Sequence, residues 1–355
     1  MIKIHQHLNR VDADVYLDSL ALKLWGFLNQ KKQGNEYRLS SLIKKLDNLI
    51  LEAETQDFLE NISLNNNEIL KRQKDVLIYL KNKNYHKLKA CVISKPDELF
   101  VLRNEILGLI NFNELFYVNG DTVSHTPFGE KLISSLFNYN NFRKSSFCVE
   151  LLHEAGFENV TCPYCNDNPI NIVDISDEKD ENTISRAYLE LDHFFPKSRI
   201  PFFALSFYNL IPSCGACNAT EKRDKDFCIS THVNPYFESF NDIYKFFVNP
   251  YPLALGERPS IEIKQLGNKN DLSSTDLKLE SRYNIIHKGA VLNLIKMYQN
   301  YRTKGGYYNK EFGLDWEEAL LQNVPKTENE ILRKRAGKMY LDIVKQIDEI
   351  GILNL

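Results

Sequence analysis

Four cysteines occur as two C-x-x-C pairs, Cys162-Pro-Tyr-Cys165 and Cys214-Gly-Ala-Cys217. A gap of two residues lets both thiolates of a pair reach one ion, and two pairs supply the four soft ligands of a tetrahedral zinc. Such a closed site leaves no position for substrate, so we predict a structural zinc that adds folding free energy. The alternative is buried free cysteines or a redox pair. A redox C-x-x-C usually lies near a βαβ pattern, which this sequence does not show.

Between the two pairs the chain carries Asp192-His193, followed by Pro196. Hydrolysis of a phosphodiester needs an activated water, and a neutral histidine can take its proton near neutral pH. It also needs a cation that stabilises the charge developing on the phosphate. If this stretch is a strand, Asp192 and His193 would point to opposite faces and could divide these two tasks. Asn218, directly after the second cysteine pair, offers a further oxygen ligand, and Mg²⁺ commonly takes one or two protein ligands together with waters and phosphate.

Three stretches with this spacing resemble the zinc-containing HNH endonucleases, which carry a ββα-metal motif. They are T-C-P-Y-C-N at Thr161–Asn166, L-D-H-F-F-P-K-S at Leu191–Ser198, and N-L-I-P-S-C-G-A-C-N at Asn209–Asn218. Among these enzymes, the sequence looks most similar to HNH effectors of bacterial anti-phage defence systems. The resemblance covers the segment from Cys162 to Lys222 and does not extend to the flanks.

The resemblance implies a role for each matched residue. Asp192 and Asn218 would hold a catalytic divalent ion, and His193 would be the general base. Asn209 would orient the loop that carries this histidine. The position filled by Asn218 is a histidine in many members of the family. An asparagine there would shift the metal preference toward magnesium or manganese.

Three basic residues are further candidates. Lys222, Lys197 and Arg199 could contact the substrate phosphate. Each of the singled-out residues also has an ordinary structural interpretation. Lys222 could be a solvated surface lysine, and Asn218 could simply cap the helix that follows Cys217.

The composition sets limits on these hypotheses. The chain has 355 residues and a net charge of -3, from 44 basic and 47 acidic residues. This charge argues against a nonspecific nucleic-acid coat protein, although a local groove or a metal can offset phosphate repulsion. Seven cysteines, an odd number, favour metal binding in a reducing compartment over a disulfide framework. Since neither an apolar leader nor a membrane-spanning apolar run is evident, we predict a cytoplasmic protein.

We predict an α+β fold in which a small ββα-metal core with a four-cysteine zinc site is flanked by mainly helical regions. Residues 1–150 form a helical N-terminal region with a regulatory or substrate-recognising role. Residues 151–250 form the HNH nuclease domain, in which each of the two C-x-x-C pairs is a zinc knuckle. Residues 251–355 form a mainly helical C-terminal region. An acidic run at 174–181 is predicted to be a solvated loop.

Particular residues support the helical flanks. Thr126 followed by Pro127 is typical of a helix start, and we expect that helix to reach Leu136. Apolar residues at helical spacing mark further helices. They are Leu17, Leu20, Leu24 and Leu28; Leu39, Leu42, Leu46 and Leu49; Ile285, Leu292, Ile295 and Tyr298; and Ile331, Met339, Ile343 and Ile347.

The sequence therefore predicts a metal-dependent endonuclease that hydrolyses DNA, with structural Zn²⁺ and catalytic Mg²⁺ or Mn²⁺, as the effector of a defence or restriction system. A noncatalytic zinc module that binds nucleic acid or protein is one alternative, but it would not need Asp192-His193. An RNA-cleaving toxin would share the same site chemistry. Related defence nucleases are often encoded beside an ATPase, and this chain has no G-x-x-x-x-G-K-[ST] loop. The resemblance thus implies a separate ATPase or sensor protein as a partner, and no membrane.

Overall fold

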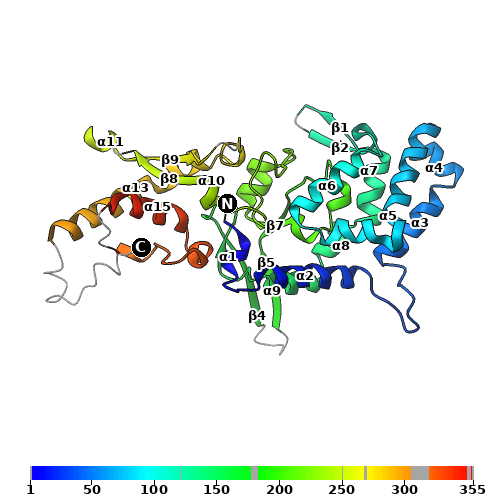
Figure 1. The fold of residues 1–355 in the computed structure, drawn as a ribbon, viewed down its shortest axis with the longest axis horizontal. Coiled ribbons are helices and arrows are strands. Elements are labelled where there is room, and N and C mark those ends of the chain that lie inside the picture. The colour runs from blue at the N-terminus through cyan, green and yellow to red at the C-terminus, as the bar shows by residue number, and fades with distance from the viewer. Residues whose placement is uncertain are drawn as a thin grey trace.

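The computed structural model describes residues 2–120, 122–176, 183–249, 251–267, 270–304 and 320–349, together with residue 353. Within these ranges, helices are combined with four small antiparallel sheets, so the fold is α+β. The molecule is elongated, with N-terminal helices at one end and C-terminal helices at the other (Figure 1). None of the helices in these ranges has both the length and the apolarity needed to cross a membrane.

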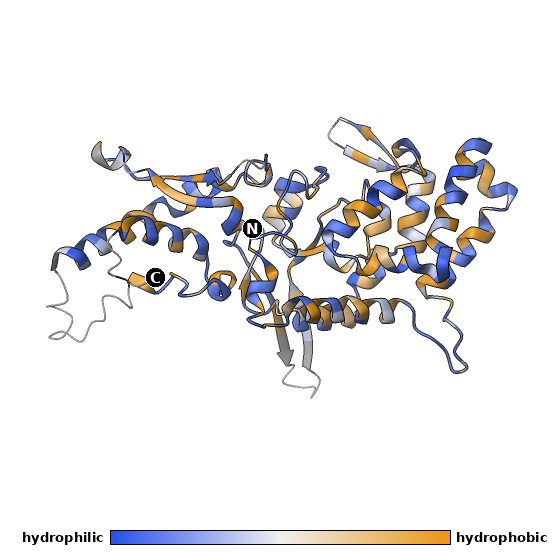
Figure 2. Cartoon of the chain, in the orientation of Figure 1, coloured by the Kyte–Doolittle hydropathy of each residue, from blue (hydrophilic) through white to orange (hydrophobic). Residues whose placement is uncertain are grey.

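The first part of the chain is helical and is interrupted by one hairpin. Its elements are α1 (Ile4–His7), α2 (Ala13–Leu28), α3 (Leu42–Glu52), α4 (Gln56–Asn61), α5 (Asn67–Ile93), α6 (Pro96–Leu107), η1 (Phe112–Glu114), β1 (Phe116–Asn119), β2 (Thr122–His125), α7 (Pro127–Lys131), η2 (Leu132–Leu136), α8 (Tyr139–Arg143) and α9 (Ser146–Glu154). Most of these helices have one apolar and one polar side (Figure 2), which is the pattern that buries one face of each helix.

The predicted helix starts can be compared with the structure. Thr126 caps α7, because its hydroxyl accepts a hydrogen bond from Gly129 N at 3.1 Å, and helical turns continue to Leu136 as predicted. Leu39 departs from the prediction. It is 71% exposed, because α3 begins only at Leu42.

The middle of the chain contains the cysteine pairs. Its elements are β3 (Val160–Thr161), β4 (Pro169–Ser176), β5 (Thr183–Tyr188), β6 (Glu190–His193), η3 (Pro201–Phe203), η4 (Phe207–Asn209), β7 (Leu210–Ser213) and η5 (Ala216–Lys222). Strands β6 and β7 pair antiparallel, with Asp192 opposite Ile211 and His193 opposite Leu210, and the helical turns of η5 follow directly. Most of the predicted acidic loop, residues 177–181, lies outside the described residues.

The last part of the chain is not purely helical. Its elements are α10 (Phe240–Ile243), β8 (Tyr244–Asn249), α11 (Tyr251–Ala254), β9 (Ser260–Gln265), α12 (Ser273–Asp276), α13 (Leu279–Lys304), η7 (Glu328–Arg333) and α15 (Gly337–Ile347). Because β8 pairs with β9, the predicted boundary at residue 250 falls inside a hairpin. Ile295 and Tyr298 are buried on α13 as predicted, whereas Ile285 is 84% exposed.

Side chains of the flanking helices close both edges of this two-stranded sheet. Asp342 of α15 accepts a hydrogen bond from Phe246 N at 2.9 Å on β8. Asn284 of α13 accepts one from Ile261 N at 2.9 Å on β9. These contacts occupy backbone groups that an open sheet edge would leave free to pair with another chain.

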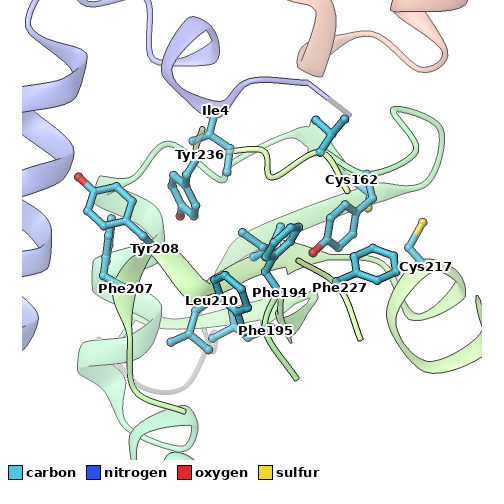
Figure 3. Close-up of a cluster of buried hydrophobic side chains, with 14 of the residues drawn as sticks. Ile4, Cys162, Phe194, Phe195, Phe207, Tyr208, Leu210, Cys217, Phe227 and Tyr236 are labelled. Carbon is cyan, nitrogen blue, oxygen red and sulfur yellow. The ribbon is translucent and has the colours of Figure 1, made fainter. Parts of the chain in front are cut away.

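An aromatic core formed by side chains of the middle segment also packs against the N-terminus of the chain (Figure 3). Phe194, Phe207 and Tyr208 are buried in it, together with the N-terminal Ile4. Ile4 N donates to Pro235 O at 2.9 Å, which holds α1 against this core. The apolar run that follows residue 199 is also buried and belongs to this core.

Candidate active site

The four cysteines of the two pairs come together. Their sulfur atoms all lie within 4.8 Å of one another, and all four side chains are buried. Cys165 Sγ and Cys214 Sγ are 3.9 Å apart. A zinc ion with Zn–S bonds of about 2.3 Å holds its sulfurs roughly 3.8 Å apart, so the cluster fits a zinc ion. The structure therefore contains a cluster that could hold a metal ion such as zinc.

Burial and mutual hydrogen bonds shift the pKa values of the four thiols in opposite directions. Burial raises the pKa of Cys162 well above its usual value. Hydrogen bonds from Cys162 and from the other two thiols lower the pKa of Cys214. A divalent cation would allow all four to ionise.

Two donors outside the cysteine pairs approach the sulfurs. Asn168 Nδ2 lies 3.3 Å from Cys214 Sγ, and Arg282 Nη1 on α13 lies 3.3 Å from Cys217 Sγ. Burial opposes the charge of Arg282, but the sulfurs of Cys217, Cys165 and Cys214 together outweigh it and raise the pKa of the guanidinium. A zinc bound by four thiolates carries a net charge of about -2, which such donors help to offset. No sequence pattern points to Arg282, because it lies far from the motif along the chain.

Asp192 is buried in β6, and each of its carboxylate oxygens has a donor. Tyr164 OH donates to Oδ2 at 2.6 Å, and Lys222 Nζ donates to Oδ1 at 2.9 Å. The two side chains of the Asp192–Lys222 ion pair are 3% and 1% exposed. Because a carboxylate oxygen has more than one lone pair, each oxygen keeps acceptor capacity, and Asp192 is one of the residues that line the pocket.

His193 is the last residue of β6, and its ring is fixed in one tautomer. Nε2 lies 3.0 Å from Ala204 O. A carbonyl only accepts, so Nε2 carries the proton and Nδ1 has the free lone pair. The ring also meets Tyr139 of α8 edge-on, with 4.6 Å between the ring centroids. Burial, with a smaller effect of the Lys197 charge, lowers the pKa of His193 to about 3, so the imidazole is neutral at physiological pH.

Asn209 holds the loop that follows His193. Its Oδ1 accepts from Phe195 N at 2.7 Å, and its Nδ2 donates to Phe195 O and to Phe203 O, both at 3.1 Å. Phe203 is followed directly by Ala204, whose carbonyl oxygen accepts the hydrogen bond from the imidazole of His193. Asn209 thus hydrogen-bonds the backbone on both sides of this loop, and the orienting role that the resemblance implies for it stays a prediction.

Asn218 lies in η5, on the same pocket as Asp192 and His193. Its Nδ2 donates to Glu190 Oε2 at 2.8 Å. The side chains of Asp192 and His193 have separate partners, as expected for neighbours on a strand. Both nevertheless line this pocket, which has a volume of about 580 Å³.

The three predicted phosphate contacts lie in different surroundings. Lys222 is buried: its ammonium donates to Asp192 and, at 2.7 Å, to His193 O. It is an internal cation, not the exposed one that the sequence suggested, because η5 folds back onto β6. Arg199 donates from Nε to Asp224 O at 3.1 Å and lies over the ring of Phe116, so it ties the β1–β2 hairpin to this segment.

Of the three predicted phosphate contacts, Lys197 is the one that remains available in the pocket. It lines the pocket, its ammonium lies 4.6 Å from the centre of the Tyr139 ring, and it forms no ion pair with a described residue. Burial lowers the pKa of Lys197. A neighbouring phosphate would stabilise the charged form of this ammonium by an ion pair.

The pocket also contains residues that sequence analysis did not find. His125 of β2, Tyr139 and Arg143 of α8, and Glu190 of β6 all line it. Arg143 donates to Leu189 O at 2.8 Å, and this hydrogen bond connects α8 to the residue directly before β6. The N-terminal helical region thus forms one wall of the site. No local pattern around these residues signals this, because the contacts arise only from the packing of α8 against β6.

The first cysteine pair is anchored to the C-terminal region. Asn166, directly after Cys165, donates from Nδ2 to Ile331 O at 2.8 Å, and its Oδ1 accepts from Lys338 N at 2.8 Å. The neighbouring Asp167 is buried and is bound by His287 Nε2 at 2.9 Å and by Arg335 Nε at 2.8 Å. The knuckle and the C-terminal helices therefore form one connected unit.

Comparison of the chain with protein-family models, curated proteins and solved structures finds no match. Membership of the HNH endonucleases therefore stays a prediction, which rests on the motif residues and on the geometry of the pocket.

Proposed function

We propose that this protein is a metal-dependent endonuclease that hydrolyses phosphodiester bonds, with DNA as the preferred substrate and a role as effector of an anti-phage defence or restriction system. The observation that carries the proposal is the state of His193. Its proton is fixed on Nε2 by Ala204 O, and the lone pair of Nδ1 has no partner among the described residues. A neutral imidazole held in one tautomer is suited to accept the proton of an attacking water. The negative charge of a bound phosphate would raise the pKa of His193 and strengthen it as a base.

Hard oxygen donors beside His193 fit a magnesium or manganese ion. Asp192 offers a carboxylate and Asn218 an amide oxygen, and both line the pocket. Two protein ligands leave room for waters and for a substrate oxygen. Such an ion, when bound, would supply electrophilic stabilisation of the phosphate and of the leaving oxygen. Lys222 balances the charge of Asp192 from the protein side and holds it in place.

The charges around the pocket support a phosphate-bearing substrate. Besides Lys197, the pocket is lined by Arg143, Arg223 and His125. With Lys222, four cationic side chains line the pocket against the three carboxylates of Glu190, Asp192 and Asp224, a more basic balance than the net charge of -3 of the whole chain. This local charge would attract a polyanion to the pocket without causing nonspecific binding of nucleic acid to the rest of the surface.

The proposal is tested by incubating the zinc-loaded protein with plasmid, linear duplex DNA, single-stranded DNA and RNA. Each is tested with Mg²⁺, with Mn²⁺ and with EDTA. We expect cleavage of DNA that needs the divalent ion and is lost in His193→Ala. His86→Ala is the matched control, because His86 is exposed on α5, away from the pocket.

Three results would argue against the proposal. Failure of the wild type to cut any substrate, with intact binding, would favour a noncatalytic binding module. Cleavage of RNA alone would favour an RNA-cleaving enzyme. Equal rates for the wild type and His193→Ala would remove the assigned base.

A separate ATPase or sensor protein is proposed as a partner, on the resemblance to defence nucleases. Copurification of the chain from its native operon tests this. Retention of a nucleotide-binding protein is the expected result, and recovery of the chain alone would count against it.

A further inference from the structure

Glu190 is a polar residue of the pocket to which neither the motif nor the proposed chemistry assigns a role. It begins β6 two residues before Asp192, and alternate residues of a strand share a face. Its side chain is half-buried and lines the same pocket. Its only hydrogen-bond donor among the described side chains is Asn218, whose Nδ2 lies 2.8 Å from Oε2.

This contact fixes the orientation of the Asn218 amide. A carboxylate only accepts, so the end of the amide that faces Glu190 must be the NH₂ group. The opposite end, Oδ1, then points away from Glu190. No hydrogen bond to this oxygen occurs within the described part of the chain, which leaves it available to a cation.

The carboxylate of Glu190 also lies close to the second cysteine pair. A Cβ atom on Gly215 would lie 3.0 Å from Glu190 Oε1, so the carboxylate packs closely beside the backbone of this pair. The backbone of residues 214–217 is in turn fixed by the sulfur cluster. The zinc knuckle, Glu190 and Asn218 thus form one continuous chain of contacts.

We infer that Glu190 is a positioning residue that orients the amide oxygen of Asn218 toward the divalent ion of the pocket. This inference rests on the proposed function, because it assumes that Asn218 is a ligand of that ion. Partners that orient metal ligands typically contribute about 10–100-fold in metal affinity.

The test measures Mn²⁺ binding by electron paramagnetic resonance on the full, zinc-loaded chain, without nucleic acid. The variants are Glu190→Ala, Glu190→Gln, Asn218→Ala and the double variant Glu190→Ala with Asn218→Ala. We expect Glu190→Ala to weaken Mn²⁺ binding by about 10-fold or more. Glu190→Gln should stay near the wild type, because its amide oxygen can still accept from Asn218 Nδ2. In the Asn218→Ala background, Glu190→Ala should have no further effect.

Three outcomes would overturn the inference. Wild-type affinity in Glu190→Ala would show that the contact does not matter for the ion. An equal loss in Glu190→Gln and Glu190→Ala would make the carboxylate charge, not the orientation of Asn218, the cause. Additive losses in the double variant would show that Glu190 does not act through Asn218.

Controls separate these results from misfolding and from the proposed function. Zinc content and thermal midpoint are measured for each variant. If Glu190→Ala does not load zinc, Glu190→Met replaces it in the same cycle, because it fills similar space without an acceptor. A protein that binds Mn²⁺ with the expected pattern but cuts no nucleic acid would refute the nuclease proposal and leave the inference intact.

Discussion

Replacing Lys222 with methionine tests the role that its buried position gives it. The Lys222 ammonium lies 2.9 Å from Asp192 Oδ1 and 2.7 Å from His193 O, and both side chains of the ion pair are almost fully buried. Methionine keeps most of the volume but leaves the Asp192 carboxylate with Tyr164 as its one remaining hydrogen-bond donor. Breaking a buried pair by removing one partner costs about 3–5 kcal/mol, because an uncompensated charge stays buried. We expect a loss of this size in the free energy of unfolding.

The assay is urea unfolding of the zinc-loaded protein in a double-mutant cycle with Asp192→Asn. If the buried charge is the cause, the double variant is more stable than Lys222→Met alone. Lys225→Met is the matched control. Lys225 pairs with Asp276 at a partly exposed site, where such a pair contributes about 0–1 kcal/mol. A loss of less than about 1 kcal/mol in the free energy of unfolding of Lys222→Met, or strictly additive losses in the cycle, would refute the reasoning. Lys222 would then again be a candidate phosphate contact.

Four further outcomes are expected. Cys214→Ser, or chelation of zinc, should remove the metal and unfold the middle segment, seen as loss of zinc by elemental analysis together with loss of far-ultraviolet circular dichroism. Asn166→Ala leaves backbone groups of the C-terminal segment unpaired and should cost about 1–3 kcal/mol, seen by urea unfolding and by faster proteolysis near Ile331. Lys197→Ala should weaken DNA binding and reduce the slope of log affinity against log salt by about 1, and an unchanged slope would exclude a phosphate contact. Burial lowers the pKa of His7 in the folded protein, so the unfolded chain binds a proton at this residue more readily. The free energy of unfolding is therefore highest above pH 6.5, the ordinary pKa of histidine. It falls as the pH drops from 6.5 toward the lowered pKa of the folded state. Thermal midpoints measured against pH should show this slope, and His7→Gln should reduce it.

Several features of the site could be read from the sequence because they depend on short-range geometry. The spacing within each C-x-x-C pair brings two thiolates to one side of a tight turn, and two pairs suffice to define a four-sulfur cluster. Thr126 could be recognised as a helix cap because the acceptor and the amide it binds are three residues apart. The motif also drew attention to Asn209, which the structure places at the loop that holds His193.

Other expectations failed where the outcome depends on how elements pack. Leu39 and Ile285 occur at helical spacing but are exposed, because α3 starts later than the pattern suggests and because only part of α13 faces the core. The boundary expected at residue 250 separates two strands that in fact pair with each other. A sequence pattern reports local period, and it does not report which face of an element finds a neighbour.

The sequence by itself determined which residues are chemically able to act: the four thiolates of two cysteine pairs, an imidazole and a carboxylate between these pairs, and an amide directly after the second pair. Only the tertiary structure decided that Lys222 is an internal partner of Asp192, that Glu190 holds Asn218, and that Arg143 of the N-terminal region lines the same pocket. The physical reason is that such contacts join elements that are distant along the chain. Their formation depends on packing that no local spacing encodes.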